Sequence, residues 1–235
     1  MDSISPQSVA LGMPGRPARP RVREHLVDVT AVTDLTPWYR RVEYAANGLF
    51  DRWTPDPGAY LLLNLTSQNG SPAQRSYTIR EATSTTFCCE FVMHGGDGPG
   101  CRWAAEARVG TTLSVSEPPY NLSIPDTSQA LLVADPTALP AVASLATALG
   151  PRMALTVIVE DGHPDHGLIP LPLPVTWVDS IDEARLDAAT AGLDPQNCFL
   201  WAAGERRLAK TVREYARQRF VVPRSAQHIQ TYWIA

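Results

Sequence analysis

The fold is decided by residues 130–150, which read ALLVADPTALPAVASLATALG. Residues 130–135 form an almost continuous apolar run of strand length, and residues 137–150 have the composition of an apolar helix. A strand that is apolar on both faces and leads directly into a helix is typical of a parallel sheet covered by helices. This stretch therefore predicts the start of an α/β domain.

The same alternation continues downstream. We predict strands at residues 153–161, 175–180, 198–204 and 228–235, and helices at residues 181–192 and 205–220. Residues 126–235 are therefore expected to form one doubly wound parallel-sheet domain.

Upstream, the pattern is that of half-buried strands. Apolar and polar residues alternate, and we predict strands at residues 21–35, 38–46, 59–65, 75–81, 85–94 and 111–119. A glycine-rich loop and a short helix interrupt them at residues 95–110. Residues 21–125 are therefore expected to form an antiparallel β-barrel or sandwich, and residues 1–20, rich in Pro, Gly and Ser, a flexible leader. A barrel docked at the carboxyl edge of a parallel sheet makes a site shared by both modules.

Composition excludes several classes of protein. The 235 residues are 44% hydrophobic and 19% charged with a net charge of -4, which argues against disorder and against nucleic-acid binding. No apolar run reaches the roughly 18 residues that span a bilayer, so we expect a cytoplasmic protein without a membrane span. The four cysteines form no CxxC pair and are expected to be reduced and buried. His163 and His166 lie in a loop without further ligands nearby, and no metal site is predicted.

Three segments resemble one family. They are RSYTIR at residues 75–80, FVMHGGDGPGCRWAAEA at residues 91–107, and ADPTALPA at residues 134–141 together with WAAGE at residues 201–205. In this order they resemble the siderophore-interacting proteins, which are flavin-dependent ferric-siderophore reductases related to ferredoxin–NADP reductases. The resemblance implies an FAD-binding barrel followed by an NAD(P)-binding-like domain.

By this resemblance, the strand that carries Arg75, Tyr77 and Thr78 binds FAD. Tyr77 offers an aromatic face to the apolar flavin ring, and Arg75, two residues earlier on the same face, can grip the pyrophosphate. Thr78 offers a hydroxyl to the polar edge of the ring, although strand alternation favours its backbone for this role.

The glycine-rich loop supplies the other predicted FAD contacts, at His94, Gly95, Pro99, Trp103 and Ala104. Glycines let the backbone approach a phosphate, and a helix start presents free N–H groups to an anion. The alternative interpretation of Trp103 is that it packs between the two domains.

The resemblance assigns Asp135, Thr137, Gly204 and Glu205 to NAD(P). The run around Asp135 departs from the family pattern, however, because Pro136 replaces an acidic residue and lacks a backbone N–H that could serve an anion. Proline is tolerated at a helix start, so we expect this change to affect nicotinamide binding more than the fold. Trp233 either covers the flavin ring, stands in the place of the nicotinamide, or packs on the last strand.

The resemblance implies that NAD(P)H reduces FAD, which then passes electrons to a ferric siderophore. Such an anionic chelate needs a local basic patch, and the candidates are Arg40, Arg41, Arg52 and Arg102. The alternative interpretation is that these arginines form a solvated face of the barrel. No catalytic acid or base is predicted. The altered nicotinamide segment leaves two alternatives: a flavoprotein acting on an organic metabolite, as a cyclase or oxidoreductase, and a binding module without turnover.

Overall fold

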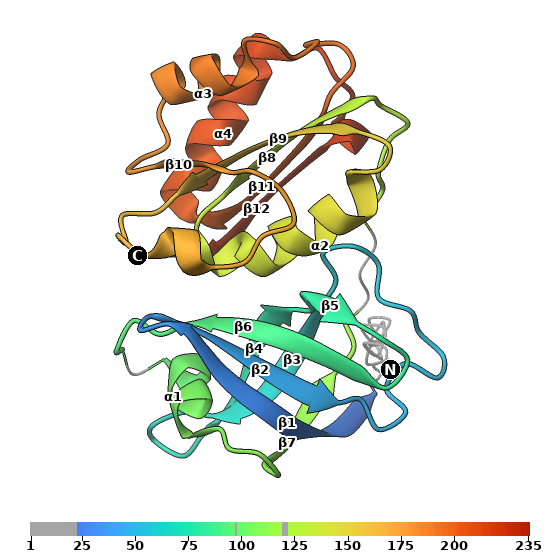
Figure 1. The fold of residues 1–235 in the computed structure, drawn as a ribbon, viewed down its shortest axis with the longest axis vertical. Coiled ribbons are helices and arrows are strands. Elements are labelled where there is room, and N and C mark those ends of the chain that lie inside the picture. Colours follow the sequence, from blue (N-terminus) through green and yellow to red (C-terminus); the bar gives the residue numbers. More distant parts are fainter. Residues whose placement is uncertain (1–22, 97, 119–121) are drawn as a thin grey trace, which may run out of the picture.

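The chain folds into two sheets that follow one another in sequence (Figure 1). The computed structural model describes residues 23–96, 98–118 and 122–235, and the predicted leader at residues 1–20 lies outside them. The last strand of the first sheet ends at Ser116, and the first strand of the second begins at Gln129.

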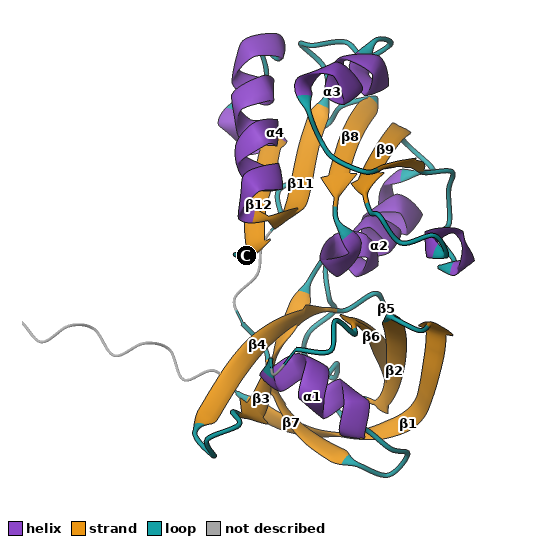
Figure 2. Ribbon diagram, turned by 90° about the vertical axis from the view of Figure 1, so that its left-hand side faces the viewer, coloured by secondary structure: helices purple, strands orange, loops and turns teal. Residues whose placement is uncertain are grey.

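The first sheet is antiparallel and curls into a half-barrel (Figure 2). Its strand order is β4-β3-β7-β1-β2-β6-β5. The strands are β1 (Glu24–Thr36), β2 (Tyr39–Ala45), β3 (Tyr60–Thr66), β4 (Pro72–Thr78), β5 (Glu81–Ala82), β6 (Thr86–Val92) and β7 (Thr112–Ser116). The helix α1 (Pro99–Glu106) contacts β3, β4 and β6 and closes the open side of the barrel.

The strand predicted at residues 75–81 is divided into β4 and β5, and β4 starts earlier than predicted. β4 begins at Pro72 rather than Arg75, because its pairing with β3 continues to the Thr66–Pro72 pair. Gly70, with φ of +82°, lets the chain reverse tightly after Asn69, and Asn-Gly is a strong signal for such a hairpin.

The second sheet is parallel, with the order β10-β9-β8-β11-β12. Its strands are β8 (Gln129–Ala134), β9 (Ala154–Glu160), β10 (Thr176–Val178), β11 (Phe199–Glu205) and β12 (Gln227–Trp233). Three helices cover it, namely α2 (Leu139–Leu149), α3 (Glu183–Thr190) and α4 (Arg206–Arg219). The order reverses between β8 and β11, and this switch point faces the barrel (Figure 2). The predicted barrel and doubly wound domain are both confirmed.

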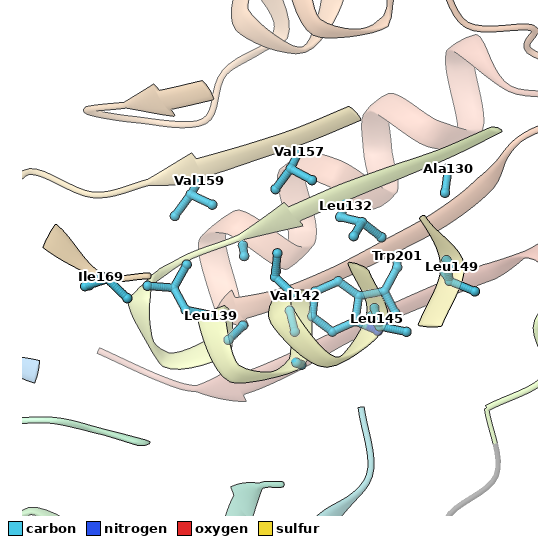
Figure 3. Packing of buried hydrophobic residues seen from close by; sticks show 14 of the residues in the cluster. Ala130, Leu132, Leu139, Val142, Leu145, Leu149, Val157, Val159, Ile169 and Trp201 are labelled. Carbon is cyan, nitrogen blue, oxygen red and sulfur yellow. The ribbon is translucent and has the colours of Figure 1, made fainter. Parts of the chain in front are cut away.

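The helix α2 forms the layer between the second sheet and the barrel (Figures 1 and 3). Its buried side chains Leu139, Val142, Leu145 and Leu149 recur at helical spacing and pack with Trp201 of β11. Burial of each such side chain is worth about 1.5–3 kcal/mol. Trp38 and Tyr39 of the barrel belong to the same hydrophobic cluster, so the core of the second domain extends into the first.

Two further contacts tie the domains together. The Trp38 ring stacks on His163 with centroids 3.9 Å apart, and its indole nitrogen donates to Asp165 at 2.5 Å. Among the described residues, no group of three or more His, Cys, Asp or Glu side chains is placed to hold a metal ion. All four cysteines are free and buried, as predicted. Nowhere in the described ranges is there a helix with the length and apolar character needed to cross a membrane.

Candidate functional site

Arg75 and Tyr77 both lie on β4, and the Tyr77 ring packs against the barrel core. Arg75 is exposed, and its guanidinium donates only to the neighbouring Gln74 carbonyl at 2.8 Å among the contacts described. The half-buried Tyr77 ring lies 4.3 Å from the Phe91 ring, and burial raises the pKa of its hydroxyl. A Cβ atom at Gly100 would come within 1.9 Å of the Tyr77 hydroxyl oxygen, so the observed position of Tyr77 requires glycine at residue 100.

The loop between β6 and α1 presents backbone N–H groups. Gly95 has φ of +69° and is exposed, and His94 is exposed while its Nδ1 accepts from the Gly96 N–H at 3.1 Å. The N-cap of α1 is Gly98, which has no side chain to cap the helix, and Pro99 follows it. Among the described residues, no N-cap side chain therefore accepts from the N–H groups of the first turn.

Trp103 and Ala104 face the barrel rather than the loop. Trp103 stacks near Tyr44 and Phe91, with centroids 6.1 and 5.6 Å away, and belongs to the barrel core. The described ring partners of Trp103 therefore belong to the barrel. Ala104 is fully buried, and its carbonyl accepts from Arg40 Nη1 at 2.8 Å.

The residues predicted to bind NAD(P) lie around the side chain of Asp135. Its Oδ1 accepts from the backbone N–H and the hydroxyl of Thr137, at 2.9 and 2.5 Å. Its Oδ2 accepts from the Glu205 N–H at 2.7 Å and from the indole nitrogen of Trp233 at 2.8 Å. Burial raises the pKa of this carboxyl group, and the hydrogen bonds from Thr137, Trp233 and Glu205 lower it in part.

The ends of β11 and β12 complete this cluster. Gly204 has φ of +152°, and a Cβ there would lie 2.6 Å from Asp135 Oδ2. The Glu205 carboxylate accepts from the Arg207 N–H at 2.6 Å and thereby caps α4. Trp233 was expected to cover the flavin, replace the nicotinamide or pack on the last strand, and its observed partner is the Asp135 carboxylate.

Sequence reasoning missed Tyr232 and Gly100. Burial of its hydroxyl raises the pKa of Tyr232 to about 12, although 37% of the residue is exposed. The Tyr232 hydroxyl lies close enough to the Thr78 side chain for Thr78 to lower its pKa in part, so the last strand approaches the end of the predicted flavin strand. The sequence carried a signal for the contact between Asp135 and Thr137 alone, because Asp at a helix start commonly accepts from the N–H two residues on.

Most of the predicted basic patch is occupied by protein partners. Arg40 pairs with Asp34 at 2.6 Å, and Arg41 pairs with the buried Glu90 at 2.7 Å. Arg102 donates to the Thr66 carbonyl. Three of the four candidate arginines are therefore engaged within the barrel.

The residues present fit FAD better than they fit a nicotinamide nucleotide. The β4 face and the glycine-capped start of α1 lie side by side, since α1 contacts β4 and Gly100 packs on Tyr77. This combination offers an aromatic surface, a guanidinium group and a helix start that its N-cap side chain leaves uncapped, as a flavin diphosphate requires. The edge around Asp135 instead presents a carboxylate that is bonded to the protein itself.

Two family models match the chain in succession. The one described as siderophore-interacting FAD-binding domain matches residues 53–122, and the one described as siderophore-interacting protein matches residues 127–235.

Two curated relatives and one solved structure show the range of similar proteins. The mycobactin import ATP-binding/permease protein IrtA of Mycobacterium tuberculosis is 29% identical over 225 residues, which are 91% of this chain and 26% of that protein. The chain thus spans about a quarter of the length of such relatives. The ferric acinetobactin reductase of Acinetobacter baumannii is 24% identical over 231 residues, covering 90% of this chain and 81% of that protein. The siderophore-interacting protein SipS of Aeromonas hydrophila superposes with a TM-score of 0.75 at 24% identity, covering 92% of this chain and all of that chain, which demonstrates a common fold.

Proposed function

We propose that this chain, which belongs to the siderophore-interacting protein family, is an FAD-dependent reductase of ferric siderophores. The observation that carries the proposal is the pairing of the Arg75–Tyr77 face with the glycine-capped start of α1. The similarity to a ferric acinetobactin reductase supports a ferric siderophore as the substrate class.

The barrel residues would hold FAD by complementary chemistry. Tyr77 would pack against the flavin ring, because Phe91 and Gly100 fix its own ring at the edge of the barrel. Arg75 would pair with the diphosphate, which would also accept from N–H groups of the loop that starts at His94 and Gly95 and leads to Pro99.

Bound FAD would supply the electron transfer, taking two electrons as hydride from NAD(P)H and passing them singly to two ferric ions. Ferrous iron is held less tightly than ferric iron by the hard oxygen ligands of a siderophore, so reduction would release the metal. Since the reaction requires no acid–base side chain, the protein contributes binding and position. A cytoplasmic location would give it access to nicotinamide cofactors.

A second candidate function is supported by the closed edge around Asp135. A family member with impaired nicotinamide use could retain FAD and act on an organic metabolite in specialised metabolism. The hydrogen bonds that saturate Asp135 favour this candidate, because they leave that carboxylate no free acceptor site.

Colour and its loss test both candidates. The purified protein incubated with FAD and gel-filtered is expected to remain yellow, and to bleach anaerobically with NADH or NADPH and recover on addition of a ferric siderophore. Yellow protein that no nicotinamide bleaches would support the second function. A colourless protein would refute both.

The site assignment has its own test. Arg75→Ala should lower FAD retention at unchanged folding, because its side chain is exposed. Tyr77→Ala should lower FAD retention and also destabilise the barrel, because its ring packs on Phe91. Arg52→Ala, an exposed barrel arginine outside the proposed site, is the matched control and should retain FAD. Full FAD occupancy in both site variants would overturn the assignment.

A further inference from the structure

We propose that Asp135 is a positioning residue that latches Trp233 across the carboxyl edge of the second sheet and so keeps this edge closed to a nicotinamide nucleotide. The inference rests on the proposed function in that the nucleotide is the proposed electron donor. An ionised carboxylate has about four acceptor sites, and the four donors from Thr137, Glu205 and Trp233 fill all of them.

The backbone after Asp135 is closed to an anion as well. Of residues 136–140, two are prolines without an N–H. The other three N–H groups donate to a side-chain and a backbone oxygen of Asp135 and to the Pro136 carbonyl. The turn that would receive a nucleotide phosphate in a doubly wound fold therefore has no free N–H group between residues 136 and 140.

The end of β12 is shaped to make the latch. Its register against β11 shifts between Gly204 and Glu205, which leaves Tyr232 as an extra residue before Trp233. Such irregularities re-aim side chains. Trp233 bonds Asp135 within the second domain, whereas the neighbouring Tyr232 lies beside Thr78 of the barrel, so two consecutive side chains are directed to different domains.

The latch predicts an affinity penalty for the nucleotide. If the edge binds a nucleotide only when Trp233 has left Asp135, the apparent affinity falls in proportion to the open fraction. Loss of one hydrogen bond to a charged group is worth a factor of about ten or more. An unlatched variant should therefore bind the nucleotide about tenfold more tightly.

The test compares Trp233→Phe with Trp177→Phe. The first keeps an aromatic ring but removes the donor to Asp135, while the control changes a half-buried tryptophan on β10 that stacks on His166. NADP⁺ and NAD⁺ binding is titrated calorimetrically, on the chain without flavin and after FAD loading. Asp135→Asn and the double variant with Trp233→Phe complete a cycle that measures whether the two side chains act through one another.

The indole N–H resonances report the latch without any ligand. The chain has six tryptophans, and the resonance lost in Trp233→Phe identifies Trp233. It should be protected from solvent exchange in the wild type and exposed in Asp135→Asn, with nucleotide binding strengthened in Trp233→Phe, unchanged in Trp177→Phe, and non-additive in the double variant.

Two results would overturn the latch. One is a Trp233 indole that exchanges freely in the wild type, and the other is NADP⁺ affinity that is equal or weaker in Trp233→Phe. Failure to retain FAD would count against the proposed function instead, because the titration of the flavin-free chain still decides the latch.

Discussion

Two of the junctions where a strand leads into a helix treat an anion in opposite ways. At the β6–α1 junction the N-cap is Gly98, which contributes no acceptor, so the first N–H groups of α1 are free of side-chain capping. At the β8–α2 junction Asp135 accepts from the Thr137 N–H and prolines remove two others. The same local geometry thus offers or withholds an anion site according to the capping residue.

The difference teaches that a parallel sheet facing a barrel is not evidence of nucleotide binding by itself. On the barrel side the described N-cap residue of α1 supplies no side-chain acceptor, whereas on the sheet side the N–H groups after Asp135 bond to the protein itself. Substitution of one glycine in each region tests this difference. Gly100 packs against Tyr77 in the barrel, and Gly204 packs against Asp135 at the edge of the second sheet.

The largest effect is expected from Gly100→Ala. The new Cβ would lie 1.9 Å from the Tyr77 hydroxyl oxygen, so the ring or the helix must move. Overpacking of this kind costs about 1–3 kcal/mol, and displaced Tyr77 should also lower FAD retention. Urea unfolding and gel filtration with FAD measure both effects.

Gly98→Ala is the matched control for stability in the same loop. Its Cβ would be 4.0 Å from the nearest His94 atom, and its φ of -58° suits alanine. It should leave the free energy of unfolding unchanged or raise it by roughly 0.4–1 kcal/mol. Equal destabilisation by both substitutions would contradict the packing of Tyr77 on α1.

Most of this architecture could be predicted because it follows from local patterns. The apolar periods of residues 126–235 identified each strand and helix of the second sheet, and the RSYTIR segment marked β4. Arg75 and Tyr77 were expected to share one face by strand alternation. In the fold Arg75 is exposed, whereas the Tyr77 ring is half-buried and packs against the barrel core.

The closed edge could not be predicted because it depends on contacts between distant segments. Asp135 and Trp233 are 98 positions apart, and the register shift that places Trp233 depends on the pairing of β11 with β12. Periodicity does not report such convergence. The position of Trp103 inside the barrel was missed for the same reason, since its neighbours Tyr44 and Phe91 come from other strands.

A smaller effect is expected from Gly204→Ala, which breaks the closed edge. An alanine there would be held at φ of +152° with its Cβ 2.6 Å from Asp135 Oδ2. We expect a loss of roughly 1–2 kcal/mol in stability and faster exchange of the Trp233 indole N–H, with FAD retention intact. Gly167→Ala, whose Cβ would meet nothing within 4 Å, is the control. Loss of FAD from Gly204→Ala would show that the two regions are not independent.

The smallest effect concerns pH and sharpens the comparison, because it should act on β12 alone. Burial lowers the pKa of His228 below its usual 6.5, and the interaction of its ring with the Gln230 side chain opposes this in part. The unfolded chain therefore takes up the proton first on acidification, so the contribution of His228 to stability is complete above pH 6.5 and is lost as the pH falls through its folded pKa. Tyr77 stays protonated throughout, since burial raises its pKa above the usual 10.0.

In urea titrations from pH 7.5 to 5, the unfolding free energy of the wild type should therefore fall more steeply than that of His228→Gln. The Trp233 indole should exchange faster in the acidified wild type than in the variant, because His228 and Trp233 share one strand. FAD retention at the barrel should respond equally in both proteins. Parallel stability curves for the two proteins would show that β12 does not bury His228 as described, and would weaken the case that this strand holds the edge closed.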